Sequence, residues 1–364
     1  MSPIAKNVSV LAGNVHRITF LVLGVICMLV RPGLAQQPSP NAINTDASPP
    51  TNTVVANITV GTDAAFAAVS PDSTTVYVTS RSDNTVSVIN ASTNEVTSVI
   101  SVGSTPIGLA LTPDGTTLYV SNLIDGTVSV IDTATNAVIG VVKVGDIASR
   151  LGANPNGKTI YVPFSTGIRI IDTGTNQITA TVPVKNAQPV QVLFNRDGTY
   201  AYALCQVGQS NKGNEIYGIL QINTSSLVTK EYLWNQLPGS DSAVTDISKN
   251  TLLITEFIQK GNGNAALAVF DTVTGAITGK APFKSYDGGA LMPAITPNGA
   301  YAYVPTVPDI IIVDIATRKA VGEPIPIEAS FVAIAPNGKY AYAGATIGNP
   351  KSHGAVLVIA IGPK

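Results

Sequence analysis

One short pattern recurs along this chain at nearly even spacing, and it constrains the fold more than any other feature. The clearest copy has an apolar segment at Leu109–Thr112, a turn at Pro113–Gly115 and a second apolar segment at Thr117–Asn122. The first three copies lie 42 residues apart, and the six steps from Pro71 to Pro336 average about 44 residues. The turns of the seven copies are Pro71-Asp72, Pro113-Asp114-Gly115, Pro155-Asn156-Gly157, Arg196-Asp197-Gly198, Ser248-Lys249-Asn250, Pro297-Asn298-Gly299 and Pro336-Asn337-Gly338.

Each repeat has the composition of four short strands joined by tight turns. Proline presets φ at the first corner of the turn, Asp or Asn tolerates the second, and glycine accepts the positive φ that closes it. In the clearest copy a third strand is expected at Val128–Ile131, a second turn at Asp132–Asn136 and a fourth strand at Val138–Val144. Four such strands in 40 to 45 residues are typical of a propeller blade. The sequence therefore predicts an all-β fold, a seven-bladed β-propeller with four-stranded blades.

The two ends of the repeat region predict how the ring closes. The last repeat supplies only three strands, at 331–335, 340–345 and 355–361. Val54–Val60, followed by Gly61, has the pattern of a fourth strand but precedes the first complete repeat. We expect Val54–Val60 to be the outermost strand of the last blade, because this pairing covers sheet edges that would otherwise be open. The propeller domain is thus predicted at residues 53–364.

The N-terminal residues have the features of a signal peptide at 1–35. A basic start is followed by the apolar run Ile18–Val30 and the small residues Gly33–Ala35, where cleavage is expected. Thirteen apolar residues are too few to cross a bilayer comfortably, although a retained short anchor is the alternative. Residues 36–52, rich in proline, serine and asparagine, predict a disordered linker. The expected location is the periplasm, the cell surface or the extracellular space.

Charge and cysteine content narrow the function further. Cleavage near Ala35 leaves 18 basic and 22 acidic residues, a net charge of −4 without the basic surface that nucleic-acid binding needs. We therefore expect no nucleic-acid partner and no stable membrane span. Cys205 is the one cysteine left, in an apolar strand where a buried, inert thiol is expected.

The motif also resembles a known family. Tyr119–Asn122 (YVSN), preceded by Pro-Asp-Gly and followed by Val-Ser-Val-Ile-Asp, is similar to the YVTN-type β-propeller repeat. That resemblance implies a bacterial or archaeal surface or periplasmic propeller. It is strong in the first three repeats and weak around residues 225–250. The wider fold also resembles lactonases and electron-transfer propellers, so it does not select a function.

Residues with catalytic chemistry are scarce. His353 is the only histidine left after signal cleavage, so a Ser-His-Asp or Cys-His site would have to use it. The sequence has no covalent haem motif, no clustered metal ligands and no phosphate-binding glycine loop before a helix. We therefore expect neither a metal nor a cofactor.

A ligand site is expected on one face of the ring, around the mouth of the central channel. In a propeller the connections from fourth to first strand and from second to third strand meet on that face. Arg81 and Arg150 suit an anion there, because a planar guanidinium binds carboxylate or phosphate with two hydrogen bonds. Two long connections, 206–215 and 257–264, are expected on the same face. The candidate binding residues are Arg81, Asp125, Arg150, Gln188, Lys260, Asp287 and His353.

Three functional hypotheses follow. The leading one is a secreted or periplasmic propeller that binds a protein or a small polar ligand. It is expected to be a monomer and, because catalytic groups are scarce, not an enzyme. The second is a lactonase-like hydrolase that uses Glu256 or Glu328 with an arginine. The third is a structural spacer at the cell surface.

Overall fold

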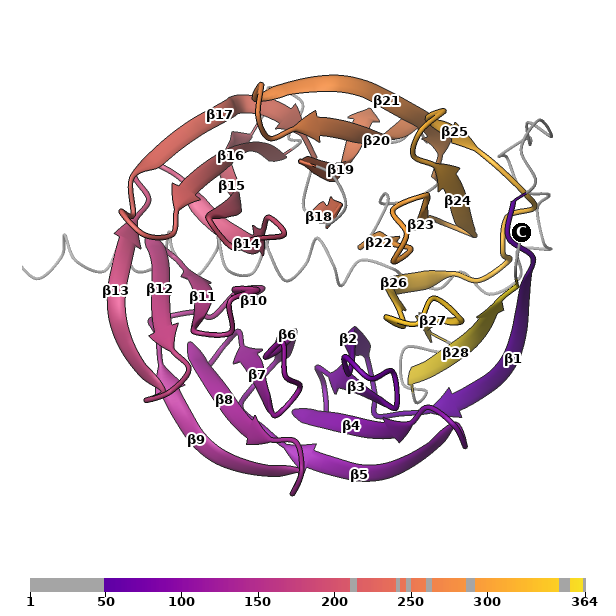
Figure 1. The fold of residues 1–364 in the computed structure, drawn as a ribbon, viewed down its shortest axis with the longest axis horizontal. Helices are drawn as coiled ribbons and strands as arrows, with labels where there is room; N and C mark the ends of the chain where they lie inside the picture. Colours follow the sequence, from indigo (N-terminus) through magenta and orange to yellow (C-terminus); the bar gives the residue numbers. More distant parts are fainter. Residues whose placement is uncertain are drawn as a thin grey trace, which may run out of the picture. The chain divides into compact units, whose positions relative to one another are not determined.

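The protein is described by a computed structural model of residues 49–209, 215–239, 243–246, 250–259, 264–285, 292–346 and 354–362. Within these residues all regular structure is β, and the strands form seven four-stranded antiparallel sheets. The sheets stand around a common axis like the blades of a propeller (Figure 1). The predicted fold class is confirmed.

Each blade runs from its innermost to its outermost strand in chain order, except blade 7, whose outermost strand comes from the N-terminal side. Blades 1 to 3 contain β2 Ala64–Val69, β3 Thr75–Ser80, β4 Thr85–Asn90 and β5 Glu95–Ser101; β6 Pro106–Leu111, β7 Thr117–Asn122, β8 Thr127–Asp132 and β9 Ala137–Lys143; β10 Gly152–Ala153, β11 Thr159–Phe164, β12 Gly167–Asp172 and β13 Gln177–Pro183. Blades 4 and 5 contain β14 Gln188–Phe194, β15 Tyr200–Gln209, β16 Glu215–Asn223 and β17 Thr229–Pro238; β18 Ala243–Asp246, β19 Thr251–Gln259, β20 Asn264–Asp271 and β21 Ala276–Lys284. Blades 6 and 7 contain β22 Ala294–Ile295, β23 Tyr301–Pro305, β24 Ile310–Asp314 and β25 Lys319–Ala320; β26 Ala329–Ile334, β27 Tyr340–Thr346, β28 Gly354–Ile361 and β1 Asn52–Thr59.

The hydrophobic core lies between neighbouring blades. One cluster joins Tyr77 and Val88 of blade 1 to Leu118 and Val120 of blade 2, all at most 3% exposed. Strand alternation sends side chains to both faces of each sheet, and in a ring both faces meet another blade. Each such side chain stabilises the fold by about 1.5–3 kcal/mol through burial. The blades therefore depend on one another for their cores.

The Pro-Asp-Gly turns also connect blades. Gly115 has a φ of 74°, and an added Cβ there would lie 3.0 Å from the ring of Pro71 in the preceding blade's turn. The motif glycine thus meets two requirements at once, a left-handed backbone and close contact with the previous turn. Within the turn, hydrogen bonds from Thr112 and Thr116 to the carboxylate of Asp114 lower its pKa.

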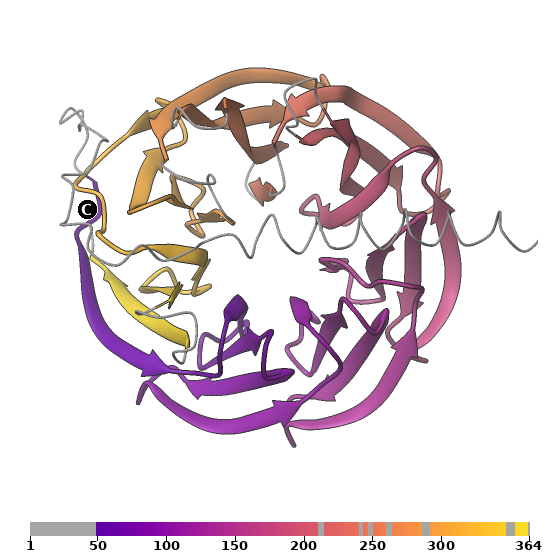
Figure 2. The same ribbon diagram turned by 180° about the vertical axis from the view of Figure 1, so that it is seen from behind.

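The ring closes as the sequence predicted. β1 pairs antiparallel with β28, from Asn52 opposite Ile361 to Thr59 opposite Ala355. Figure 2 shows the N-terminal strand, in indigo, outside the C-terminal strand, in yellow. The hydroxyl of Tyr303 in blade 6 donates a hydrogen bond of 2.6 Å to Oδ1 of Asn52, which ties this seam to the neighbouring blade.

The N-terminal predictions remain predictions. The signal peptide at 1–35 lies outside the described residues, as does most of the linker, and β1 begins at Asn52. In the described part of the chain, no helix has the length and apolar character needed to cross a membrane.

Candidate binding site on the loop face

The strand order places one set of connections on a common face, called the loop face below. These connections run from the outermost strand of one blade to the innermost strand of the next, and from second to third strand within a blade. Arg81, Asp125 and Arg150 lie in or next to such connections, as predicted. The opposite face carries the Pro-Asp-Gly turns.

Arg81 is fixed by a neighbouring carboxylate. Its Nε and Nη2 donate hydrogen bonds of 2.9 and 2.8 Å to the two carboxylate oxygens of Asp63. Its backbone N–H also donates to the Asp63 carbonyl, at 3.0 Å. Such paired, charge-assisted bonds set the plane of the guanidinium. The Arg81 side chain keeps 20% of its surface exposed, and Nη1 makes no hydrogen bond with any residue that the structure describes.

Arg150 connects blade 3 to blade 1. It lies two residues before β10, and its backbone hydrogen-bonds with Val190 and Val192 of the next inner strand, β14, at 3.2 and 3.1 Å. Its guanidinium carbon lies 5.3 Å from the ring centre of Phe66 on β2, a cation–π contact. Gly108 of blade 2 makes room for this crossing, since a Cβ there would lie 3.1 Å from Cα of Arg150.

Asp125 has a structural role in its blade. Its Oδ2 accepts a hydrogen bond of 2.6 Å from the backbone N–H of Ser104, in the connection that leads into the same blade. Asp83 repeats this contact in blade 1, where Oδ2 accepts from the N–H of Thr62 at 2.6 Å. These two carboxylates hold the loop face in shape. Gln188 begins β14 opposite Gln206 and is half-buried.

The two glutamates of the hydrolase hypothesis lie in different surroundings. Glu256 on β19 is 1% exposed, and its carboxylate accepts a bond of 2.5 Å from Lys280 on β21, the outermost strand of the blade. Glu328 is exposed in the connection between β25 and β26. No hydrogen bond or ion pair joins them within the described residues. Lys260, Asp287 and His353 lie outside the described residues.

Cys205 and Trp234 both lie in apolar surroundings. Cys205 is fully buried, and burial raises the pKa of its thiol, as expected for an inert cysteine. Trp234 packs beside Gly218 in the core of blade 4. No group of three or more candidate metal ligands occurs among the residues that the structure describes.

The sequence did not identify Phe66 as part of the site. This aromatic side chain stands alone among alanines in β2, Ala64–Val69, and that contrast was the available signal. Two contacts therefore lie close together in the sequence of blade 1: the Arg81–Asp63 ion pair just before β2, and the Phe66 ring on β2 with Arg150 from the connection into blade 3 over it. We call these four residues the arginine cluster.

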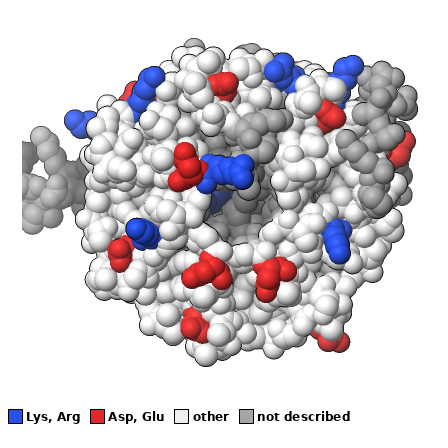
Figure 3. Space-filling view, in the orientation of Figure 1, with Lys and Arg blue, Asp and Glu red and all other residues white. Residues whose placement is uncertain are grey.

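Charged side chains are few on the face of the ring that Figure 3 shows. Some lie around the central hollow and others farther out, several of them beside a side chain of opposite charge, on a mostly uncharged surface.

The seven four-stranded sheets define the class, a seven-bladed β-propeller. Residues 49–199 match the model of a family described as YNCE-like beta-propeller, so the resemblance to YVTN-type propellers is confirmed over this stretch. No curated protein matches the chain. Among solved structures, hydrazine synthase of Kuenenia stuttgartiensis aligns with a TM-score of 0.70 and 23% identity, covering 82% of this chain and 96% of that one. A likeness at this identity shows the fold alone.

Proposed function

We propose that this propeller is a non-catalytic binding protein that takes an anionic ligand, or an anionic group of a protein partner, at the arginine cluster. The observation that carries the proposal is the fixed fork of Arg81. Two of its nitrogens are oriented by Asp63, while Nη1 remains for a second acceptor. Binding to an arginine that is already ordered costs less conformational entropy.

Arg150 supports the same assignment. Its guanidinium lies over the ring of Phe66 on β2, the strand that begins directly after Asp63, so a second cation lies over the same strand. An acid with two carboxylates can address two such cations at once. The hydrolase alternative has less support, because Glu256 is buried against Lys280 rather than presented at the channel mouth.

Calorimetric titration with succinate and citrate tests this proposal. We expect binding that weakens with added salt, and no binding of the neutral analogue succinamide. Arg81→Gln and Arg150→Gln should each weaken binding about 10-fold or more, since a charge-assisted hydrogen bond contributes about 1.5–3 kcal/mol.

Arg169→Gln is the matched control. Arg169 also lies over an aromatic ring, 4.7 Å from the centre of Phe164, but it belongs to the third strand of its blade and its Nε already donates to the Val144 carbonyl. This variant should bind succinate like the parent protein. An equal loss in this variant, or no anion binding by the parent protein, would overturn the proposal.

We also propose an extracytoplasmic location, supported by the signal-peptide features of residues 1–35. Expression of the full chain in a bacterium, followed by osmotic shock, should release a protein whose N-terminal sequence begins near Gln36. Recovery in the cytoplasm with an intact N-terminus would contradict it.

A further inference from the structure

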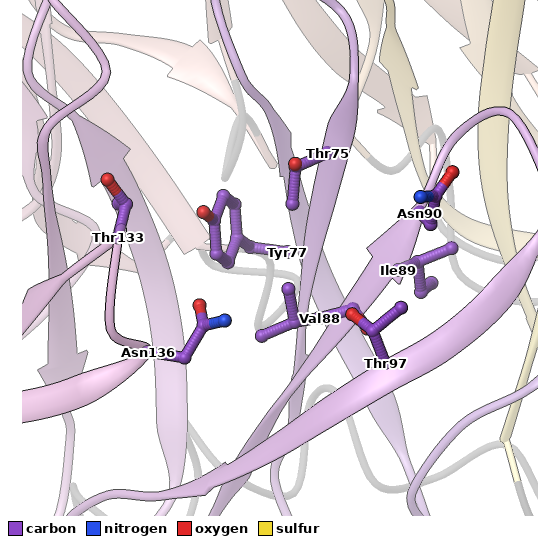
Figure 4. A pocket seen from close by; sticks show the side chains of 8 residues that line it. All are labelled: Thr75, Tyr77, Val88, Ile89, Asn90, Thr97, Thr133 and Asn136. Carbon is purple, nitrogen blue, oxygen red and sulfur yellow. The ribbon is translucent and has the colours of Figure 1, made fainter.

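A cavity of about 120 Å³, open to solvent on one side, lies between blades 1 and 2. Figure 4 shows the side chains that line it. Tyr77 comes from β3 of blade 1, Thr97 from β5, and Thr133 and Asn136 from the turn between β8 and β9 of blade 2. Tyr77 is 3% exposed.

The equivalent residues are hydrogen-bonded directly at two other blade junctions. The Tyr119 hydroxyl of blade 2 donates to Oδ1 of Asn176 in blade 3 at 2.7 Å, and Tyr303 donates to Asn52 at 2.6 Å. At the junction of blades 1 and 2 no such bond joins Tyr77 to Asn136. Both side chains point into the same space in Figure 4.

A polar atom is therefore buried there without a protein partner. Oδ1 of Asn136 has no hydrogen-bond partner among the described residues. Buried polar groups in folded proteins nearly always have one, supplied by protein, water or ligand. The equivalent Tyr342 hydroxyl and Asn94 Oδ1 at the junction of blades 7 and 1 are also unpartnered, so the open pair points to an occupant here together with the cavity between Tyr77 and Asn136.

The lining groups specify the chemistry of that occupant. The Thr97 hydroxyl already donates to the Val88 carbonyl at 3.2 Å, and the Thr133 hydroxyl donates to the Gly115 carbonyl at 2.7 Å. Both therefore offer lone pairs to the cavity, Tyr77 offers a donor, and Asn136 offers both kinds of group. No ionised side chain lines the cavity. This set suits a neutral molecule whose hydroxyls both donate and accept.

Volume limits the size of the occupant. A cavity of about 120 Å³ exceeds the ~10–15 Å³ that a single water molecule requires, so a molecule of several non-hydrogen atoms can enter it. A three-carbon polyol fills such a space, and Val88 and Ile89 give its carbon atoms an apolar wall.

We propose that the cavity between blades 1 and 2 is a binding site for a small neutral polyol, held between the Tyr77 hydroxyl and the Asn136 carboxamide. The site is independent of the arginine cluster and of the anion that the cluster is proposed to bind.

Ligand-observed NMR titration of the mature protein with glycerol tests the proposal, with glycerate as the charged counterpart. We expect saturable millimolar binding of glycerol, in keeping with the few atoms it offers, and none of glycerate. Tyr77→Phe removes the hydroxyl but keeps the ring, and should weaken glycerol binding at least 5-fold. Tyr119→Phe makes the same change at the closed junction and should leave it unchanged.

A second variant keeps the test valid if Tyr77→Phe fails to fold. Thr97 occupies a bulge in the outermost strand where blade 2 has Ile139, so Thr97→Ile introduces a residue the repeat already tolerates. It should abolish glycerol binding by narrowing the cavity. Unchanged binding in Tyr77→Phe or Thr97→Ile, an equal loss in Tyr119→Phe, or a crystal soaked in glycerol that shows only water between Tyr77 and Asn136 would overturn the proposal.

Discussion

Blade 7 and blade 2 have the same architecture but different chain connectivity. Blade 2 is one continuous segment, β6 to β9, whereas blade 7 combines β26–β28 with β1 from the other end of the propeller. Each has a bulge at its outermost pair of strands, between Val54 and Ala56 in blade 7 and between Val130 and Ile131 in blade 2.

The contacts to neighbouring blades are also alike. Tyr303 reaches Asn52 at the edge of blade 7 with a bond of 2.6 Å, and Tyr119 reaches Asn176 in blade 3 with a bond of 2.7 Å. Packing between blades therefore reproduces the same junction whether or not the strands are joined by a turn. The β1–β28 pairing, called the seam here, costs more loop-closure entropy than a pairing within blade 2. Its two strands are about 300 residues apart in the chain and no short loop joins them.

Removal of β1 is the strongest test of this comparison. A protein that starts at Thr62 loses the partner of β28, the burial of Ile58 (5% exposed) and the Tyr303–Asn52 bond. We expect a loss of roughly 3–5 kcal/mol, from about 2 kcal/mol for the isoleucine and the rest from the hydrogen bonds. The melting temperature should fall by roughly 10 °C relative to a protein that starts at Gln36.

The control for this truncation keeps β1 and removes only the residues before it. A protein that starts at Pro49 retains the whole β1–β28 register. Its melting temperature should equal that of the protein that starts at Gln36. An unchanged melting temperature in the protein that starts at Thr62 would show that the seam contributes nothing to the stability of the ring.

The blade pattern was predictable because its determinants are local. Proline, Asp or Asn, and glycine at fixed offsets specify a turn by their own backbone preferences, and alternation specifies the strands. Ring closure followed from one unpaired strand pattern at Val54–Val60. The short inner strands β10 and β22, of two residues each, carry no periodic pattern and were not predictable in this way.

For the candidate site, the sequence predicted only the face of the ring on which it lies. Strand order alone placed Arg81 and Arg150 among the loops. Their partners depend on contacts distant in sequence, since Arg150 reaches Phe66 across blade 2, and no local pattern encodes that crossing. For the same reason the sequence did not show that Glu256 faces Lys280, 24 residues further along.

Unfolding at alkaline pH compares the junction at blade 7, where the ring closes, with the junction of blades 2 and 3. The expected change in the free energy of unfolding is smaller than that for the removal of β1. Burial raises the pKa of Tyr119 to about 12 and also raises that of Tyr303 well above the usual 10. Below pH 10 both tyrosines are neutral in the folded and the unfolded chain. As the pH rises from 10 to 12, the unfolded chain ionises them and the folded chain does not, so the free energy of unfolding falls. The fall is about 1.4 kcal/mol per pH unit for each such tyrosine.

Urea unfolding between pH 9.5 and 11.5 measures this slope in single variants. Tyr119→Phe should make the slope shallower by one tyrosine. Tyr303→Phe decides the comparison. If the seam is as closed as the interior, this variant flattens the slope as much as Tyr119→Phe does. A slope equal to that of the parent protein would mean that water reaches Tyr303 in the folded state. The junction between blades 6 and 7 would then be open to solvent, unlike the junction between blades 2 and 3.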